Sequence, residues 1–499
     1  MFIDGRSVPE GHLVDTDICI IGTGPAGITL GLEFADLPFN VCLLESGDFE
    51  PRPEISELNK GPTTGRHGEA LDCRERCFGG TSNHWTGWCR PLDAIDFDQR
   101  SWVPHSGWPF AKDHLEPYYS RAHEVLGIGP PRFDAEFWKH PEGAQPLPLS
   151  PDLVRTEVYQ IEARRFGPVY RQRFERASNL SVYLHSSVVE LHGRPDSTRV
   201  FDVTAKTLEG NSFRVRAPFF ILAAGGIENP RLLLVSRSRT NVGLGNEHDI
   251  VGRCFMEHPH VNDIGFWVAA QSSIDLSYYR PWDEQEFRAV MGMLVLGREV
   301  AIRERRLGFS ATLYSRPDEG VRNPLSPSVQ RSAADVEDLD TSGLDGSDVR
   351  EYRCYCRTEQ TPNLNSRILL TDDRDALGLP RARLHWELTE QDVLNIREGL
   401  RILGRALGEA GVGRLRMPAD DLDAGWVGDI AGGCHHMGTT RMSMDPAWGV
   451  VDANCKVHGV GNLYVAGSSV FPTCGSANPT LTIVALAVRL ADHIKERMR

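Results

Sequence analysis

Short apolar runs that end on glycine or on an acidic residue are the clearest pattern along the chain. Residues 17–21, 41–44 and 219–224 have the length and composition of buried strands. A fourth such run covers residues 462–466, and the helical periodicity of residues 479–497 follows it. Apolar strands that alternate with helices are typical of a parallel α/β sheet. Because these segments occur near both ends and in the middle of the chain, we expect one discontinuous domain with a second domain inserted.

Alternating apolar and polar residues predict a different kind of sheet in the rest of the chain. The alternation covers residues 264–268, 289–296 and 309–314, and residues 388–407 have helical periodicity. Between residues 316 and 350 the chain becomes polar and acidic. We interpret this segment as a mobile surface loop, with an acidic lid over a substrate entrance as the alternative.

The first apolar run leads into a glycine pattern that is typical of nucleotide binding. Gly22, Gly24 and Gly27 follow this strand, and the second strand ends on Glu45. Gly22 permits a tight turn, Gly24 lets a pyrophosphate approach the backbone, and Gly27 lets the helix pack closely on the strand. The helix N-terminus attracts phosphate charge, and Glu45 is placed to hydrogen-bond a ribose 2′-hydroxyl. An ordinary glycine-rich turn, the alternative interpretation, leaves Glu45 unexplained.

Composition excludes some classes of protein. The 499 residues carry 54 Lys and Arg against 68 Asp and Glu, a net charge of −14, so the chain lacks the basic surplus of a nucleic-acid-binding protein. No secretory signal is visible, and no apolar run approaches the roughly 20 residues that span a bilayer, so we expect no membrane partner. Eleven cysteines, an odd and small number for this length, argue against a disulfide scaffold and favour a reducing cytoplasm.

Three further blocks combine glycine with small hydroxyl residues. They are residues 79–85 (GGTSNHW), 432–442 (GGCHHMGTTRM) and 467–480 (GSSVFPTCGSANPT). Paired glycines before small hydroxyl residues let backbone N–H groups face a planar or anionic ligand. The 48 glycines of the chain, more than is usual, therefore indicate a ligand that the backbone approaches closely.

Together with residues 221–233 (ILAAGGIENPRLL) and 251–259 (VGRCFMEHP), these blocks resemble the glucose–methanol–choline (GMC) family of flavoprotein oxidoreductases, in family order between residues 17 and 490. The wording GGTSNHW and SANPTLT is most similar to the pyranose-oxidase-like branch. The resemblance implies an α/β fold, α+β overall, in which a Rossmann-type FAD-binding domain is interleaved with a substrate domain built on a mixed β-sheet.

Domain boundaries follow from the order of these blocks. We expect the FAD-binding domain to comprise residues 1–100, 178–260 and 431–499, and the substrate domain to comprise residues 101–177 and 261–430. The sequence indicates no oligomeric state.

The resemblance implies an active site built on His435 and Asn478. His435 stands three positions before Gly438, where the family has its catalytic histidine, and Asn478 occupies the place of a second His or Asn. A neutral imidazole can remove a hydroxyl proton while the hydride passes to flavin N5, and an amide can donate a hydrogen bond to the developing alkoxide. The alternative for His435 is a buried structural histidine. We interpret His258 as structural.

Contacts to substrate and cofactor are implied in the same way. Gln360, Thr361 and Asn363 lie in a segment similar to the family's substrate-side strand, and His436 is structural unless the local turn exchanges it with its neighbour; Gln360, Asn363 and His436 are the candidate substrate contacts. The expected FAD contacts are Gly22, Gly24, Pro25, Ala26, Gly27, Glu45, Ser46, Gly79, Gly80, Thr81, Asn83, His84, Trp85, Val188, Ala223, Ala224, Gly225, Gly467, Ser468, Asn478, Pro479 and Thr480.

His84 occupies the position at which some family members link the flavin 8α-carbon to a histidine. We therefore expect FAD as the cofactor, either bonded covalently to His84 or, as the alternative, packed beside it.

The cysteines offer two other readings, which we reject. Cys73 with Cys77, and Cys354 with Cys356, lack the further thiolates that a zinc or iron–sulfur site needs, so we expect no metal. Cys434 beside His435 could suggest a thiolate nucleophile, but adjacent residues on a strand point to opposite sides.

The resulting hypothesis is an FAD-dependent oxidoreductase. It oxidises an alcohol to a carbonyl on a sugar, a glycoside or an aminoglycoside-like polyol, and oxygen or another acceptor reoxidises the flavin. One alternative is a small non-sugar alcohol as substrate. Alternatives from other classes are a non-redox FAD-containing lyase and a flavin-free binding protein on the same superfold, the latter disfavoured because the C-terminal blocks are intact.

Overall fold

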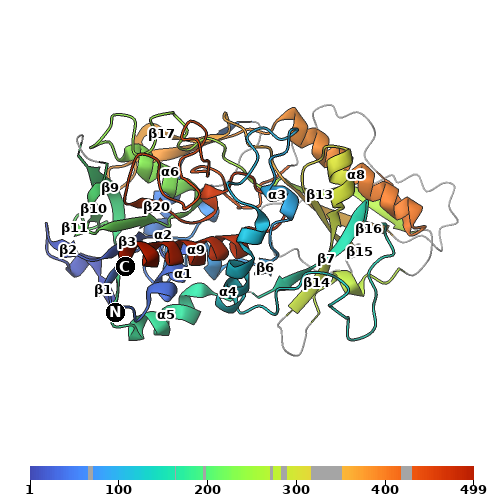
Figure 1. Cartoon of the computed structure of the whole chain (residues 1–499), viewed down its shortest axis with the longest axis horizontal. Helices are drawn as coiled ribbons and strands as arrows, with labels where there is room; N and C mark the ends of the chain where they lie inside the picture. Colours follow the sequence, from blue (N-terminus) through green and yellow to red (C-terminus); the bar gives the residue numbers. More distant parts are fainter. Residues whose placement is uncertain are drawn as a thin grey trace.

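Two β-sheets of different kinds organise the molecule (Figure 1). The computed structural model describes residues 1–65, 71–162, 164–194, 198–269, 274–282, 289–315, 351–416 and 430–499. The acidic segment at residues 316–350, for which a loop or lid is expected, lies outside the described residues.

A six-stranded parallel sheet occupies the end of the molecule at which both termini lie (Figure 1). Its strands in spatial order are β1 (Phe2–Asp4), β8 (Leu180–Leu184), β4 (Val41–Leu44), β3 (Ile18–Ile21), β12 (Phe219–Leu222) and β20 (Leu463–Val465). Every residue of β3 and β4 is buried, as expected for a parallel sheet covered on both faces. Two helices, α1 (Pro25–Phe34) and α9 (Thr480–Met498), pack against each other along this sheet.

A seven-stranded antiparallel sheet forms the other end. Its strands in spatial order are β19 (Gly413–Arg416), β13 (His260–Ala269), β16 (Glu351–Thr358), β15 (Phe309–Ser315), β14 (Ala289–Leu296), β7 (Val154–Ile161) and β6 (Trp88–Cys89). The amphipathic helix α8 (Glu390–Glu409) packs against β19 and β7.

Smaller elements complete the described chain. One small sheet contains β2 (Leu13–Asp15), β11 (Ser212–Arg216), β10 (Val200–Lys206) and β9 (Ser187–Gly193), and another contains β17 (Arg367–Arg374), β18 (Pro380–Trp386) and β5 (Thr63–Gly65). The remaining α-helices are α2 (Pro53–Ser56), α3 (Ala94–Phe97), α4 (Glu116–Leu126), α5 (Phe166–Arg176), α6 (Gly225–Val235) and α7 (Arg298–Arg303).

The predicted fold class, with parallel and antiparallel sheets on an α/β framework, is confirmed. One predicted strand is too long. The run at residues 219–224 ends as a strand at Leu222, and helix α6 begins at Gly225 because the backbone turns there with a φ of +80°. The division of the chain into two domains, with the boundaries given above, stays a prediction.

Two glycines of the first turn are required by close backbone contacts. Gly22 has a φ of +101°, and a Cβ there would lie 2.7 Å from the carbonyl oxygen of Ala223. A Cβ on Gly27 would lie 2.0 Å from the carbonyl oxygen of Gly22. Since real Cβ atoms do not approach oxygen so closely, a larger residue at either position would push α1 away from β3 and β12.

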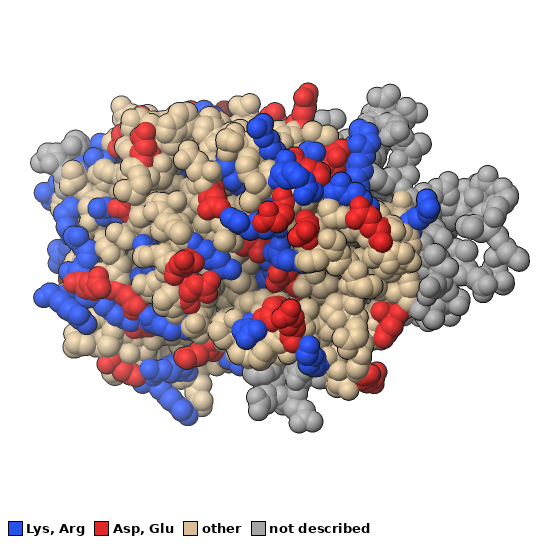
Figure 2. All heavy atoms as spheres, turned by 45° about the vertical axis from the view of Figure 1, so that its right-hand side comes forward, with Lys and Arg blue, Asp and Glu red and all other residues tan. Residues whose placement is uncertain are grey.

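Two large hydrophobic cores underlie the two sheets, one around β3, β4 and β12 and one around β13 to β16 with α8. On the face seen in Figure 2, acidic and basic side chains are mixed over the described surface. Within the part of the chain that the structure describes, no helix is long and apolar enough to cross a membrane.

Candidate active site

His435 is carried by a loop that runs antiparallel to the start of β13. Backbone bridges join His260 to Ala431 and Met256 to Met437, with N–H to carbonyl-oxygen distances between 2.8 and 3.1 Å. These two bridges bracket His435 and fix its imidazole against the side chains that precede β13.

The protonation pattern of His435 can be derived from its hydrogen bonds. His258 Nε2 lies 3.2 Å from the carbonyl oxygen of Cys474, and His258 Nδ1 lies 2.9 Å from His435 Nδ1. A carbonyl oxygen only accepts, so Nε2 of a neutral His258 carries the hydrogen and its Nδ1 accepts one from His435 Nδ1. The Nε2 atom of His435 is therefore left with its lone pair, as a general base requires.

Asn478 is oriented by Arg357. Arg357 Nη1 donates to Asn478 Oδ1 at 2.8 Å, and because arginine only donates, the amide group must turn its Nδ2 toward His435. That Nδ2 lies 3.4 Å from His435 Nε2. Arg357 itself is 1% exposed and stacks over the ring of Trp88, with 4.9 Å between the guanidinium carbon and the ring centroid. The pair of His435 and Asn478 is thus fixed from both sides.

Burial and the positive charge of Arg357 keep these histidines neutral. Loss of solvent lowers the pKa of His435 well below its usual value, and His258, His260 and Arg357 lower it further. Burial likewise lowers the pKa of His258 to about 4 and that of His260 well below its ordinary range. Near neutral pH the cluster therefore holds unprotonated imidazoles.

Three glycines at the carboxyl ends of parallel strands form an open cradle. Gly24 follows β3, Gly225 follows β12 and Gly467 follows β20, and a Cβ added at any of them would meet nothing within 4 Å. Gly24 also caps the N-terminus of α1, which has no acidic residue in its first turn. An extended anionic ligand such as the pyrophosphate of FAD fits this edge by shape and by helix charge.

Glu45 lies at the same edge, at the end of β4. Its Oε2 accepts hydrogen bonds from the backbone N–H of Thr23 at 3.1 Å and from its hydroxyl at 2.6 Å, and its Oε1 accepts from the N–H of Gly47 at 3.0 Å. The carboxyl group is 5% exposed, and burial raises its pKa. Since each carboxylate oxygen can accept two hydrogen bonds, Oε1 keeps capacity for a ribose hydroxyl.

The second glycine block holds its own loop together. Gly79 and Gly80 have φ angles of +105° and +55° and begin a short 3₁₀ turn. The Asn83 amide donates to the carbonyl oxygen of Phe78 at 2.9 Å and accepts from the N–H of Gly167 at 3.1 Å, and the Trp85 indole donates to a backbone carbonyl. The side chains of Asn83 and Trp85 thus anchor this loop. Because the Asn83 amide is used in this way, Asn83 would contact the cofactor through its backbone.

His84 differs from these neighbours because its side chain is 46% exposed. Its Nδ1 lies 2.7 Å from Glu75 Oε1, and this hydrogen bond raises the pKa of His84. Glu75 therefore holds one ring nitrogen and leaves Nε2 directed away from it. Thr81, in the same turn, accepts a hydrogen bond from the Glu75 N–H at 3.2 Å.

The structure places the other expected cofactor contacts on several elements. Ser46 accepts from Arg76 Nη1 at 3.1 Å, Ser468 donates to the carbonyl oxygen of His436 at 2.7 Å, and Val188 is buried in β9. The remaining expected contacts occupy the first turn of α1, the junction of β12 with α6, and the start of α9, and they are Pro25, Ala26, Ala223, Ala224, Pro479 and Thr480.

The expected substrate contacts are placed differently. Gln360 is completely buried, and its amide bonds to Glu257 N–H at 2.9 Å, to the Trp386 indole at 3.0 Å and to a backbone carbonyl. This placement argues against substrate contact. Asn363 caps a local turn by accepting from the N–H of Asn365 at 2.9 Å. The Nε2 atom of His436 lies 3.6 Å from Glu257 Oε1 and 3.9 Å from the Cys73 sulfur, and neither group belongs to the His435–Asn478 pair.

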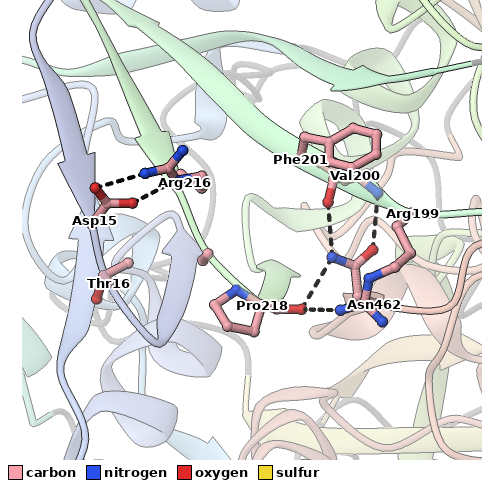
Figure 3. Close-up of a pocket in the computed structure, with 9 residues that line it drawn as sticks. Asp15, Thr16, Arg199, Val200, Phe201, Arg216, Pro218 and Asn462 are labelled. Carbon is pink, nitrogen blue, oxygen red and sulfur yellow. Dashed lines mark hydrogen bonds and ion pairs between the residues drawn. The ribbon is translucent and has the colours of Figure 1, made fainter. Parts of the chain in front are cut away.

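A surface hollow of about 360 Å³ lies at the opposite edge of the parallel sheet (Figure 3). Thr16, Pro218 and Asn462 line it, and each precedes the start of a parallel strand. The ion pair of Arg216 with Asp15, 2.6 Å long, lies at one side of it. Because the glycine cradle is at the carboxyl ends of these strands, this hollow is no part of the His435 site.

Sequence reasoning missed three residues that the structure brings to His435. His258 was expected to be structural, and neither His260 nor Arg357 was singled out. A signal existed in the run Glu257–His258–Pro259–His260, since residues two apart at the start of a strand face the same side. No local signal marks Arg357, whose role depends on Asn478, far away in the sequence.

The chain is similar to known oxidoreductases. A family profile described as GMC oxidoreductase matches residues 362–487. The fructose dehydrogenase large subunit of Gluconobacter japonicus is 23% identical over 97% of this chain and 98% of that protein. Paromamine 6′-oxidase of Streptomyces fradiae is 25% identical over 96% and 91%, and a C-glycoside 3-oxidase of Microbacterium trichothecenolyticum is 25% identical over 91% and 82%.

Solved structures share the fold. A variant of formate oxidase from Aspergillus oryzae superposes with a TM-score of 0.60 over 98% of this chain and 99% of that chain, at 17% identity. Pyridoxine 4-oxidase from Mesorbium loti gives a TM-score of 0.57 over 96% and 99%, at 18% identity.

The buried neutral histidines predict an acid-sensitive fold. In the unfolded chain His258 becomes protonated as the pH falls below about 6.5, whereas in the folded protein it stays neutral until about pH 4. The contribution of His258 to the free energy of unfolding is therefore fully present above about pH 6.5 and is lost as the pH falls toward the pKa of His258 in the folded protein. Between about pH 7 and 4.5 we expect a loss of about 2–3 kcal/mol from this group alone, measured by urea unfolding. His258→Asn should flatten the dependence, and an equally steep curve in that variant would contradict the assignment.

Proposed function

Since this chain belongs to the GMC oxidoreductases and is an FAD-dependent alcohol oxidoreductase, we propose that it oxidises a hydroxyl-bearing carbon of a sugar, glycoside or aminoglycoside-like polyol to a carbonyl. The observation that carries the proposal is the unprotonated Nε2 of His435, which has an amide donor 3.4 Å away. Relatives named for fructose, paromamine and C-glycoside oxidation support the substrate class. The proposal includes a cytoplasmic location, based on the low cysteine content.

His435 Nε2 accepts the proton of the substrate hydroxyl in this mechanism. Asn478 Nδ2 donates to the same oxygen as it becomes an alkoxide, so negative charge develops between two groups already in place. Bound FAD supplies the acceptor for the hydride that leaves the carbinol carbon. The imidazolium formed at His435 keeps its Nδ1 hydrogen bonded to His258, and the next step requires that it release the proton to solvent or product.

FAD would be held by the cradle described above. The N–H groups at the start of α1 and the backbone at Gly24 would bind the pyrophosphate, and Glu45 would accept from the ribose. The backbone at Gly467 would pass close to the cofactor, since no side chain fills that space.

An anaerobic screen of substrates tests the reaction class. We expect at least one sugar, glycoside or aminoglycoside to bleach the flavin absorbance of the purified holoenzyme, because hydride transfer to the flavin precedes any use of an acceptor. Bleaching only by small non-sugar alcohols would make the substrate class wrong. Failure of every alcohol in a broad panel would favour a lyase and overturn the proposal.

Substitutions at the pair test the roles of its members. His435→Ala should lower the rate of flavin reduction by about 10²–10⁴-fold, because the hydroxyl proton loses its acceptor. Asn478→Ala should lower it by about 10²–10³-fold through loss of a donor to the alkoxide. Stopped-flow absorbance under anaerobic conditions measures both rates, and His12→Ala, on the exposed surface, is the matched control. An unchanged rate in His435→Ala would remove it from the mechanism.

A covalent bond between flavin and His84 is the further part of the proposal. Glu75 occupies Nδ1, so Nε2 is the atom that would bond the 8α-carbon. After acid precipitation we expect the yellow colour in the protein pellet for the wild type and for His12→Ala, and in the supernatant for His84→Ala. Colour that stays wholly in the wild-type supernatant would exclude the bond.

A further inference from the structure

The two least buried cysteines of the chain lie against each other. Nine of the eleven cysteines are buried, Cys73 is partly exposed and Cys434 is exposed. The two residues are far apart in sequence, but His436, two residues beyond Cys434, places its Nε2 3.9 Å from the Cys73 sulfur, and the Cys434 side chain is the main contributor to the lowered pKa of Cys73. The thiols that solvent can reach are therefore neighbours, while the remaining ones are screened by the core.

The surroundings of Cys73 favour its thiolate. Besides the Cys434 side chain, His436 Nε2 lies 3.9 Å from its sulfur and Arg74 adds positive charge; together they lower the pKa of Cys73 to about 4. The same Nε2 atom of His436 also lies 3.6 Å from Glu257 Oε1. Cys77, four residues on, shows the contrast, because burial raises its pKa to about 12.

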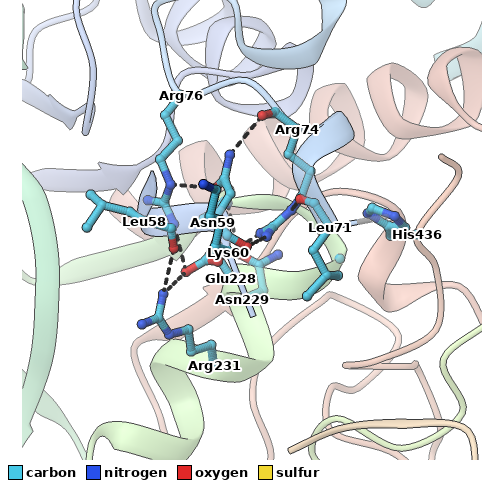
Figure 4. Close-up of polar contacts among 12 residues, drawn as sticks. Leu58, Asn59, Lys60, Leu71, Arg74, Arg76, Glu228, Asn229, Arg231 and His436 are labelled. Carbon is cyan, nitrogen blue, oxygen red and sulfur yellow. Dashed lines mark hydrogen bonds and ion pairs between the residues drawn. The ribbon is translucent and has the colours of Figure 1, made fainter. Parts of the chain in front are cut away.

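Rigid anchors hold both sulfur-bearing segments. Arg74, next to Cys73, donates to Glu228 Oε1 at 2.8 Å and to the carbonyl oxygens of Leu71 and Asn59 at 2.9 and 2.8 Å (Figure 4). Arg76 and Arg231 also converge on Glu228, so the segment around Cys73 is fixed to α6.

The other segment is held on the opposite side of the contact. Gly433 donates to Glu257 Oε2 at 3.0 Å, and Cys434 has a left-handed backbone with a φ of +58°. Cys434 does not lie in a strand, so the prediction that its side chain and that of His435 alternate across a strand is wrong. Cys434 interacts with Cys73, and the next residue, His435, contacts His258.

We propose that Cys73 and Cys434 form a reversible thiol–disulfide site that hydroperoxides oxidise. The Cys73 thiolate attacks a peroxide oxygen, the O–O bond breaks, and a sulfenic acid and, for hydrogen peroxide, one water result after protonation. The Cys434 thiol then attacks the sulfenic sulfur, the S–S bond forms, and a second water leaves. Two thiols and one peroxide thus give one disulfide and two waters, and an added dithiol reverses the change by exchange.

The disulfide would also affect the reaction, a consequence that depends on the proposed function. Cys434 directly precedes His435, so pulling its sulfur to bonding distance from Cys73 moves the backbone that carries the base. A displacement near 1 Å at a catalytic group costs about 10²-fold in rate.

Peptide mapping of the wild-type holoenzyme tests the site without reference to activity. After treatment with a small excess of hydrogen peroxide, alkylation under denaturing conditions and proteolysis, we expect a linked Cys73–Cys434 peptide as the main product, with the nine buried cysteines alkylated. Dithiothreitol should abolish it. Oxidation spread over other cysteines, or both thiols still alkylated when methionines are already oxidised, would overturn the proposal.

Two variants separate the steps. Cys434→Ser should stop at a Cys73 sulfenic acid that dimedone traps, and Cys73→Ser should slow oxidation of Cys434 at least tenfold. Dimedone labelling of Cys73 no greater than of the buried thiols in Cys434→Ser would contradict the assignment of Cys73 as the attacking group. Peptide mapping of the wild type needs no variant to fold.

Flavin reduction then tests the effect on His435. Oxidised wild-type enzyme should reduce its flavin at least tenfold more slowly, with recovery in dithiothreitol, and peroxide should not slow Cys73→Ser in this way. A quantitative disulfide with an unchanged reduction rate would overturn the effect on His435. If no alcohol reduces the flavin, the proposed function fails, whereas the peptide map still decides the thiol site.

Discussion

The carbonyl oxygen of Cys474 can only accept hydrogen bonds, and this restriction propagates through the site. It fixes the hydrogen of His258 on Nε2, which makes Nδ1 an acceptor and leaves His435 with its lone pair on Nε2, as the proposed role of a base requires. Arg357, which can only donate, fixes Asn478 from the other side. A carbonyl oxygen that only accepts and a guanidinium that only donates thus determine which atoms of His435 and Asn478 face each other.

This arrangement requires three distant stretches of chain to meet. His258 precedes the antiparallel sheet, Arg357 lies within it, and Cys474 and Asn478 come just before the last helix, which packs on the parallel sheet. Arg357 is buried beside aromatic rings, and among the described residues it has no carboxylate partner. Burial of a cation without an anion costs free energy of folding. The same unpaired positive charge would favour the development of negative charge nearby during the proposed reaction.

The local sequence predicted the features that depend on residues close together in the chain. The apolar runs and glycine spacing located β3, α1 and β12, since a close backbone contact such as Gly27 on Gly22 is encoded by adjacent residues. The resemblance placed His435 and Asn478, which the structure brings within hydrogen-bonding reach. Gln360 had the expected residue type for a hydroxyl contact, but its amide turns inward because Trp386, far away in sequence, offers a buried indole donor. Such contacts between distant residues form only when the sheets assemble, so the pattern of apolar and polar residues along the chain does not predict them.

The electrostatics of the site also bear on the thiols beside it. The histidine cluster stays neutral because it is desolvated and lies near the Arg357 cation, and a negative charge placed among those groups would raise their pKa values. The Cys73 thiolate lies outside the cluster, against His436, and it raises the pKa of His84 as well. Conversion of that thiolate to a disulfide removes a negative charge from the neighbourhood of both imidazoles. In the proposed disulfide, charge and backbone position would therefore change together, one residue from His435.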